Sequence, residues 1–124
     1  MVQRRFKRKQ VALSCEFWLV QIQEIKSGRK SEKKMVVSPQ KYRGTIMDIS
    51  IGGCALKTGS TIQAGSRLKI AFENIDGQRI AALGQVIRTN RSGGTGIILH
   101  TKFLKIPQRG QNAINAMVFE YDQD

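Results

Sequence analysis

Short extended segments separated by turn signals run through most of this sequence, and this succession constrains the fold more than any other feature. Residues 67–73 alternate apolar and charged side chains, the period-2 pattern of a strand with one buried face. Asp76-Gly77 follows as a strong hairpin signal, and residues 80–89 form the expected returning strand. Further strands are expected over residues 11–25, 42–49, 54–57 and 97–103.

The pattern changes near the C-terminus. Residues 107–120 begin with a proline, which suits the first turn of a helix. The apolar residues Ile114, Met117, Val118 and Tyr121 then recur at helical spacing. The sequence therefore predicts a mostly-β chain: a six-stranded antiparallel β-barrel with a C-terminal α-helix packed on it.

The segment that follows the first expected strand is polar. Residues 26–34, with the sequence KSGRKSEKK, are charged around a central glycine, and we expect a mobile, solvated loop at a hairpin tip. Pro39 interrupts the extended stretch at residues 35–37. Because proline cannot donate to a strand ladder, an edge strand is expected there.

The length of 124 residues fits one domain, which we divide into a basic arm over residues 1–10, the barrel over 11–106 and the helix over 107–120. Apolar residues make up 40% of the chain, enough for a core. No apolar run approaches the ~20 residues that span a bilayer, and no signal-peptide pattern follows the basic N-terminus. We expect a cytoplasmic protein that does not insert into membranes.

Signatures of catalysis and of metal binding are missing from the sequence. Cys15 and Cys54 lack CxxC spacing, and the single His100 cannot complete a zinc set with them, so we expect reduced, partly buried thiols and no metal site. There is no GxSxG, HExxH or Walker A motif. His100 is interpreted as a packed or surface histidine rather than a base. The chain is therefore predicted to be no enzyme, with no catalytic residue and no cofactor.

Positive charge dominates the composition. The chain has 21 Lys and Arg against 9 Asp and Glu, a net charge of +12, and residues 1–34 contribute more than half of this excess. A basic surface attracts phosphates, whether of nucleic acid, phospholipid or a phosphorylated small molecule. Composition alone does not choose among these partners.

The segment DISIGG, residues 48–53, forms a compact DxSxxG motif at the end of an expected strand. Asp48 and Ser50 are two residues apart and so point to the same face. A carboxylate beside a hydroxyl can accept hydrogen bonds from N1–H and N2–H of a guanine. Gly52 and Gly53 are expected to let the chain turn sharply and a ligand approach the backbone, with Gly53 in a turn that calls for a positive φ.

The segment QRRFKRKQ, residues 3–10, supplies the complementary chemistry. Arg4 and Arg8 have RxxxR spacing, and Arg5 adds a further guanidinium. A guanidinium binds guanine O6 and N7 in bidentate fashion, pairs with phosphate and stacks on a planar base. A ligand made of guanines and phosphates would use both segments. The polar arm is expected to be flexible when free.

The two motifs, in this order, resemble those of the PilZ domain family, receptors for the bacterial second messenger cyclic-di-GMP. GTIMDISIGGCALKT is similar to the family's strand–turn–strand, AALGQVIRTN to its later strand, and GIILHTKFLKI with the following helix to its closing segment. The likeness covers residues 3 to 120. Two features depart from it: the polar Lys9 and Gln10 after the arm, and the length of the basic segment 26–34.

The resemblance implies a function and a set of site residues. The arginines would contact the phosphates and guanine faces of cyclic-di-GMP, the DxSxxG carboxylate and hydroxyl a guanine edge, and the glycines the close turn. The arm would order over the barrel on binding, and a downstream protein or neighbouring domain would recognise the new surface. The implied ligand-binding residues are Arg4, Arg5, Arg8, Asp48, Ser50, Gly52 and Gly53.

Three other interpretations stay open. A small basic β-barrel can bind RNA or single-stranded DNA, although the aromatic residues form no evident stacking ladder, which makes nucleic acid an unlikely partner. The chain could also be a module for an acidic protein. In addition, Asp48 and Ser50 could be local turn-formers that bond backbone amides.

Overall fold

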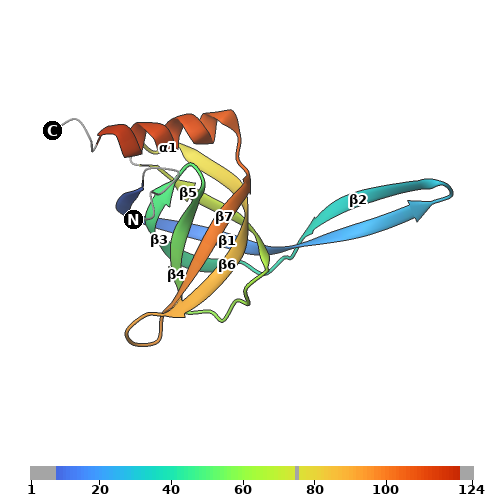
Figure 1. The fold of residues 1–124 in the computed structure, drawn as a ribbon, viewed down its shortest axis with the longest axis horizontal. Helices are drawn as coiled ribbons and strands as arrows, with labels where there is room; N and C mark the ends of the chain where they lie inside the picture. Colours follow the sequence, from blue (N-terminus) through green and yellow to red (C-terminus); the bar gives the residue numbers. More distant parts are fainter. Residues whose placement is uncertain (1–7, 75, 121–124) are drawn as a thin grey trace, which may run out of the picture.

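The computed structural model describes residues 8–74 and 76–120, which form seven strands and one helix (Figure 1). The elements are β1 (Lys9–Ser27), β2 (Lys30–Val37), β3 (Tyr42–Ser50), β4 (Gly53–Thr58), β5 (Arg67–Glu73), β6 (Arg79–Arg91), β7 (Ile97–Lys105) and α1 (Gln108–Glu120). No described helix is both long and apolar enough to cross a bilayer.

Six of the strands close into an antiparallel barrel. The sheet order is β2-β1-β3-β4-β7-β6-β5, and β1 also pairs with β5, from Cys15 opposite Phe72 to Val20 opposite Arg67. This pairing joins the two ends of the sheet, so that β1, β3, β4, β7, β6 and β5 form a ring. Closure leaves no free edge along the ring. The predicted six-stranded barrel with a C-terminal helix is confirmed.

Inward-facing side chains of all six barrel strands fill the interior. Phe17, Ile46, Ile70 and Leu99 are among the residues with no exposed surface. Helix α1 covers one end of the barrel, against β3 and β6 (Figure 1).

The apolar stripe predicted for the helix forms its contact with this core. Ile114, Met117 and Val118 are buried, whereas Tyr121 lies outside the described residues. The stripe therefore explains why a helix at the end of the chain packs on the barrel rather than extending from it.

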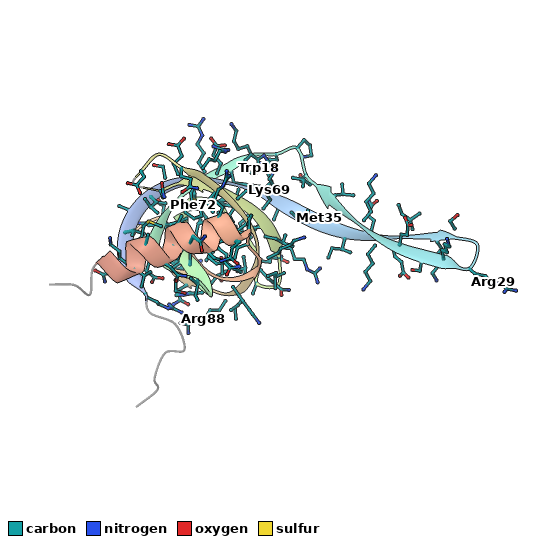
Figure 2. All side chains as sticks on the ribbon, turned by 90° about the horizontal axis from the view of Figure 1, so that it is seen from above. Trp18, Arg29, Met35, Lys69, Phe72 and Arg88 are labelled. Carbon is teal, nitrogen blue, oxygen red and sulfur yellow. The ribbon has the colours of Figure 1, made fainter. Side chains whose placement is uncertain are left out.

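The far half of β1 and the whole of β2 leave the barrel as a two-stranded ribbon (Figure 1). Pairing runs from Val20 opposite Val37 to Ser27 opposite Lys30, with Arg29 at the tip (Figure 2). Gly28 has a φ of 62°, the left-handed conformation that a two-residue reversal requires.

The ribbon corrects the expected loop over residues 26–34 and confirms the edge strand. Only Gly28 and Arg29 separate the two strands, because the antiparallel ladder continues through the polar residues on either side. Polar side chains do not prevent strand pairing when both faces of a ribbon are solvated. The edge strand expected before Pro39 is present, since β2 is the outermost strand of the sheet.

Both cysteines are free, as predicted, and both are buried inside the barrel rather than partly buried. Burial in apolar surroundings disfavours the charged thiolate. It raises the pKa of the Cys15 thiol to about 12 and the pKa of Cys54 well above its ordinary value. The two thiols are therefore core side chains and not reactive groups.

Candidate ligand-binding site

The structure brings the end of the basic segment next to the DxSxxG motif. Strand β1 begins directly after Arg8, and Gln10 pairs with Asp48 of β3. The Nη1 atom of Arg8 lies 3.7 Å from Oδ1 of Asp48, and the two side chains are 43% and 28% exposed. The two motifs therefore meet on the outside of the barrel. Arg4 and Arg5 lie outside the described residues.

Pairing with β3 also begins immediately after Arg8. Lys9 lies opposite Ile49, and Gln10 opposite Asp48. Although these two residues are polar, the strand at this junction is therefore formed. The register shifts between Gln10 and Leu13, so that β1 bends as it enters the barrel.

A bulge in β3 determines which way Asp48 points. The register with β4 shifts between Ile46 and Asp48, which leaves Met47 as the extra residue, 39% exposed. Ile49 then points inward with no exposed surface, so Asp48 and Ser50 lie on the opposite face of the strand. A bulge re-aims side chains in this way at many functional sites.

The two polar side chains of the motif have different roles in the structure. The Ser50 hydroxyl accepts a hydrogen bond of 3.1 Å from the Gly52 amide and donates one of 3.4 Å to the Gly53 carbonyl, and the residue is buried. Ser50 therefore closes the β3–β4 turn, as the turn-forming interpretation predicts. Asp48 does not: its buried Oδ1 has no hydrogen-bond partner among the described residues. Its carboxylate therefore does not hold the turn and contacts Arg8 at ion-pair distance.

The expectation that Gly53 needs a positive φ is wrong. The described glycines with positive φ are elsewhere, and Gly53 is the first residue of β4. The reason for glycine is steric: a Cβ there would overlap the Thr101 carbonyl oxygen and lie 3.2 Å from the Lys102 Cα. Gly52 also lacks a positive φ, and its carbonyl accepts a 2.9 Å hydrogen bond from the Phe103 amide. Gly53 thus lets β7 approach the turn closely, and the Gly52 carbonyl bonds the same strand.

Strand pairing adds residues to this face that the motifs do not include. One row across β1, β3, β4, β7 and β6 consists of Gln10, Asp48, Ala55, His100 and Arg88. The neighbours of this row in β4 and β7 are buried in the core, so the row itself faces outward. Sequence reasoning did not place His100 and Arg88 on this face, because only the register across three strand pairs brings them near Asp48.

The charges in this row act on the histidine. Burial, the positive charge of Arg88 and, more weakly, that of Arg8 lower the pKa of His100, and Asp48 opposes them only in part. His100 is therefore neutral near pH 7. A neutral imidazole has one N–H donor and one acceptor nitrogen. Its Nε2 is buried and, like Asp48 Oδ1, lacks a hydrogen-bond partner in the described part of the chain.

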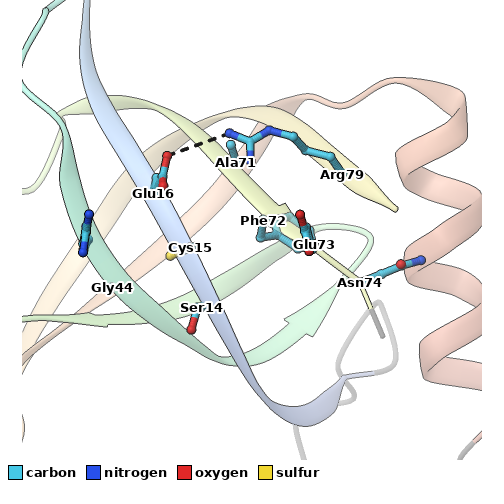
Figure 3. A pocket seen from close by; sticks show the side chains of 10 residues that line it. Ser14, Cys15, Glu16, Gly44, Ala71, Phe72, Glu73, Asn74 and Arg79 are labelled. Atoms are coloured by element: carbon cyan, nitrogen blue, oxygen red, sulfur yellow. Dashed lines mark ion pairs between the residues drawn. The ribbon is translucent and has the colours of Figure 1, made fainter. Parts of the chain in front are cut away.

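A separate depression lies on the outer face where β1 passes between β3 and β5 (Figure 3). Ser14, Glu16, Glu73 and Arg79 are among its lining residues, and none of the two motifs' residues is. The Glu16 carboxylate is paired with Arg79 and with Lys41, each at 3.8 Å. The Asp48 carboxylate has a similar ion pair with Arg8, so the depression differs from the Asp48 face in that it contains none of the motif residues. Within residues 8–74 and 76–120, no group of three His, Cys, Asp or Glu could hold a metal ion.

The chain is thus a closed β-barrel that carries a basic residue and a DxSxxG turn on its outer face. Residues 3–120 match the family model described as PilZ domain. The chain belongs to the PilZ domain family. No curated protein matches the sequence.

Solved structures show the same fold. The inhibitor of motility (MotI/DgrA) of Bacillus subtilis superposes with a TM-score of 0.72 at 16% identity, over 98% of this chain and 52% of that one. The PilZ domain of YcgR from Escherichia coli with c-di-GMP superposes with a TM-score of 0.62 at 16% identity, over 98% of this chain and 93% of that one. YcgR from Escherichia coli in complex with c-di-GMP superposes with a TM-score of 0.67 at 17% identity, over 98% of this chain and 46% of that one. The chain thus spans about half the length of the Bacillus protein.

Proposed function

We propose that this protein is a receptor for cyclic-di-GMP. The observation that carries the proposal is the contact between Arg8 and Asp48, 3.7 Å apart on the outer face of the barrel. It joins the two segments that the sequence marks for phosphate and for guanine. Family membership supports it, as do the YcgR structures, which contain c-di-GMP.

The chemistry of the site follows from its charges. Asp48 accepts the N1–H and N2–H donors of a guanine, which adenine lacks on the corresponding edge. Arg8 is 43% exposed and bound to Asp48 only at ion-pair distance, so it can turn to a phosphate or a guanine face without breaking a hydrogen bond. Arg4 and Arg5 would complete the phosphate contacts. Ser50, Gly52 and Gly53 hold the turn that presents Asp48.

The aromatic residues argue against an RNA or single-stranded DNA binder. Base stacking requires exposed rings along a strand face. Phe17, Phe72 and Phe103 are buried, Tyr42 is stacked on Phe17, and the Lys69 ammonium lies 5.5 Å from the Trp18 ring centroid. The described barrel therefore presents no row of free rings to successive bases.

The mechanism we infer is ordering of the N-terminal arm. Ligand phosphates neutralise the arginines of residues 3–10 and draw the arm over the outer face, and a downstream protein or neighbouring domain recognises the resulting surface. The ordering cost is taken from the binding free energy. Hydrogen exchange tests this step: amides of residues 3–10 should exchange more slowly in the complex, with little change in the barrel. Unchanged exchange of the arm in a saturated complex would refute ordering even if binding were established.

Calorimetric titration with cyclic-di-GMP, with cyclic-di-AMP as the matched control, tests the ligand. We expect binding of the guanine dinucleotide with a discrimination of ~1–3 kcal/mol against the adenine one. The affinity should fall only modestly with salt, since few phosphates are neutralised, whereas a nucleic-acid binder would show a steep dependence. Equal affinity for both dinucleotides would contradict the proposal. The absence of enzymatic activity and the cytoplasmic location stay predictions.

A further inference from the structure

The outer face continues beyond Asp48 across two more strands. His100 in β7 and Arg88 in β6 belong to the same cross-strand row, two and three strands from Asp48. Neighbouring strands are 4.7–4.9 Å apart, so the backbones of Asp48 and His100 lie about 10 Å apart. Because side chains stand roughly perpendicular to a sheet, their tips keep about this separation.

Two unsatisfied polar atoms flank the centre of this row. Asp48 Oδ1 and His100 Nε2 are both shielded from solvent, and neither has a hydrogen-bond partner among the described residues. Between them lies Ala55, whose small side chain is 5% exposed. Leaving a buried polar atom unbonded costs free energy, which a ligand with complementary groups would recover.

Arg88 is the cation that this row contains in β6, opposite His100. It is exposed on the outside of the barrel (Figure 2). Within the described chain no carboxylate lies at ion-pair distance from it, in contrast to Arg8 and Arg79. Its positive charge is one of the influences that keep the neighbouring His100 neutral.

We propose that Arg88 and His100 bind the O6/N7 edge of one guanine of cyclic-di-GMP, and that Asp48 binds the N1–H/N2–H edge of the same guanine. This inference rests on the proposed function. Two hydrogen bonds of about 2.9 Å leave about 4 Å of the roughly 10 Å span for the base, which is the width of a purine between these two edges. Arginine binds the O6/N7 pair in bidentate fashion, and a neutral imidazole donates one further N–H. Since His100 is only partly buried, a turn of its ring brings a nitrogen to the ligand.

The test is calorimetric titration of the full chain with cyclic-di-GMP and with its analogue in which N7 of the guanine is replaced by C–H. The wild type should bind the analogue about 2- to 10-fold more weakly, the value of one hydrogen bond. Arg88→Ala should bind cyclic-di-GMP roughly 10- to 150-fold more weakly and should no longer distinguish the two ligands. His100→Phe, which keeps a ring but removes the donor, should lose about 2- to 10-fold.

Arg91→Ala is the matched control, since it removes the same charge from an exposed position in β6 and should leave the affinity within about 2-fold of the wild type. Thermal melting of each variant shows that the barrel is folded. If Arg88→Ala and His100→Phe bind like Arg91→Ala, the inference is overturned, while dependence on Arg8 and Asp48 still supports the proposed function. If Arg88→Ala binds weakly but distinguishes the analogue as the wild type does, Arg88 acts on phosphate and the inference is also overturned. Failure of the wild type to bind cyclic-di-GMP would overturn both.

Discussion

Replacement of Arg8 by alanine should separate ligand binding from stability. The Arg8–Asp48 pair spans 3.7 Å and both side chains are partly exposed. Two unit charges at this distance attract by about 1 kcal/mol in water, and ordering of the side chains offsets part of it. The loss of the pair should therefore lower the free energy of unfolding by at most about 1 kcal/mol, which lowers the melting temperature of a domain of this size by about 4 °C.

Binding should suffer far more than stability. A charge-assisted hydrogen bond to phosphate contributes roughly 1.5–3 kcal/mol, so Arg8→Ala should bind cyclic-di-GMP roughly 10- to 150-fold more weakly. Arg8→Lys should be intermediate, because lysine keeps the charge but lacks the planar fork. Calorimetric titration gives the affinity, and thermal melting of the same samples gives the stability.

Arg79→Ala is the control for this experiment. It removes the same charged group and a similar ion pair, 3.8 Å from Glu16, at a place away from both motifs. Its affinity should stay within about 2-fold of the wild type, since screening weakens charges beyond about 8 Å. Equal affinities of Arg8→Ala and Arg79→Ala would show that the contact with Asp48 is an ordinary surface ion pair, and the reasoning would fail.

Asp48→Ala should abolish the preference for the guanine over the adenine dinucleotide, a loss of ~1–3 kcal/mol in discrimination measured by titration; retained discrimination would exclude Asp48 as the base-reading group. Gly53→Val should lower the free energy of unfolding by ~1–3 kcal/mol and weaken binding, because a Cβ there overlaps β7. A Cβ at Gly59 meets no atom within 4 Å, so Gly59→Val should melt like the wild type, and equal melting of the two variants would contradict the steric assignment. The raised pKa of Cys15 and Cys54 means that the folded state keeps these protons as the pH rises. Their stabilising contribution is complete below the ordinary thiol pKa near 9 and is lost as the pH approaches about 12. Urea unfolding between pH 8 and 11 should show that the free energy of unfolding falls more steeply with pH in the wild type than in the variant with both cysteines replaced by alanine. Identical slopes would refute this.

The sequence by itself determined the elements and the chemistry of the motifs. Alternation of apolar and polar residues predicts strands because side chains alternate between faces, and a helical spacing of apolar residues predicts the C-terminal helix for the same local reason. The types and spacing of Arg8, Asp48 and Ser50 likewise pointed to a phosphate and guanine ligand. These signals are local, so they survive without knowledge of the fold.

Register and closure were decided by the tertiary structure. Whether residues 26–34 form a loop or a ribbon depends on how β1 and β2 pair, and a polar sequence permits both. Gly53 looked like a turn glycine, but the approach of β7, a strand more than 40 residues later in the chain, is what requires it.

The row that joins Asp48 to His100 and Arg88 results from pairings between β3 and β4, β4 and β7, and β7 and β6, each with its own register and two of them with bulges. A shift of one residue in any of these pairs would turn a side chain to the other face of the sheet. Which distant residues share a face is therefore set by long-range strand pairing, and a local sequence pattern does not contain that information.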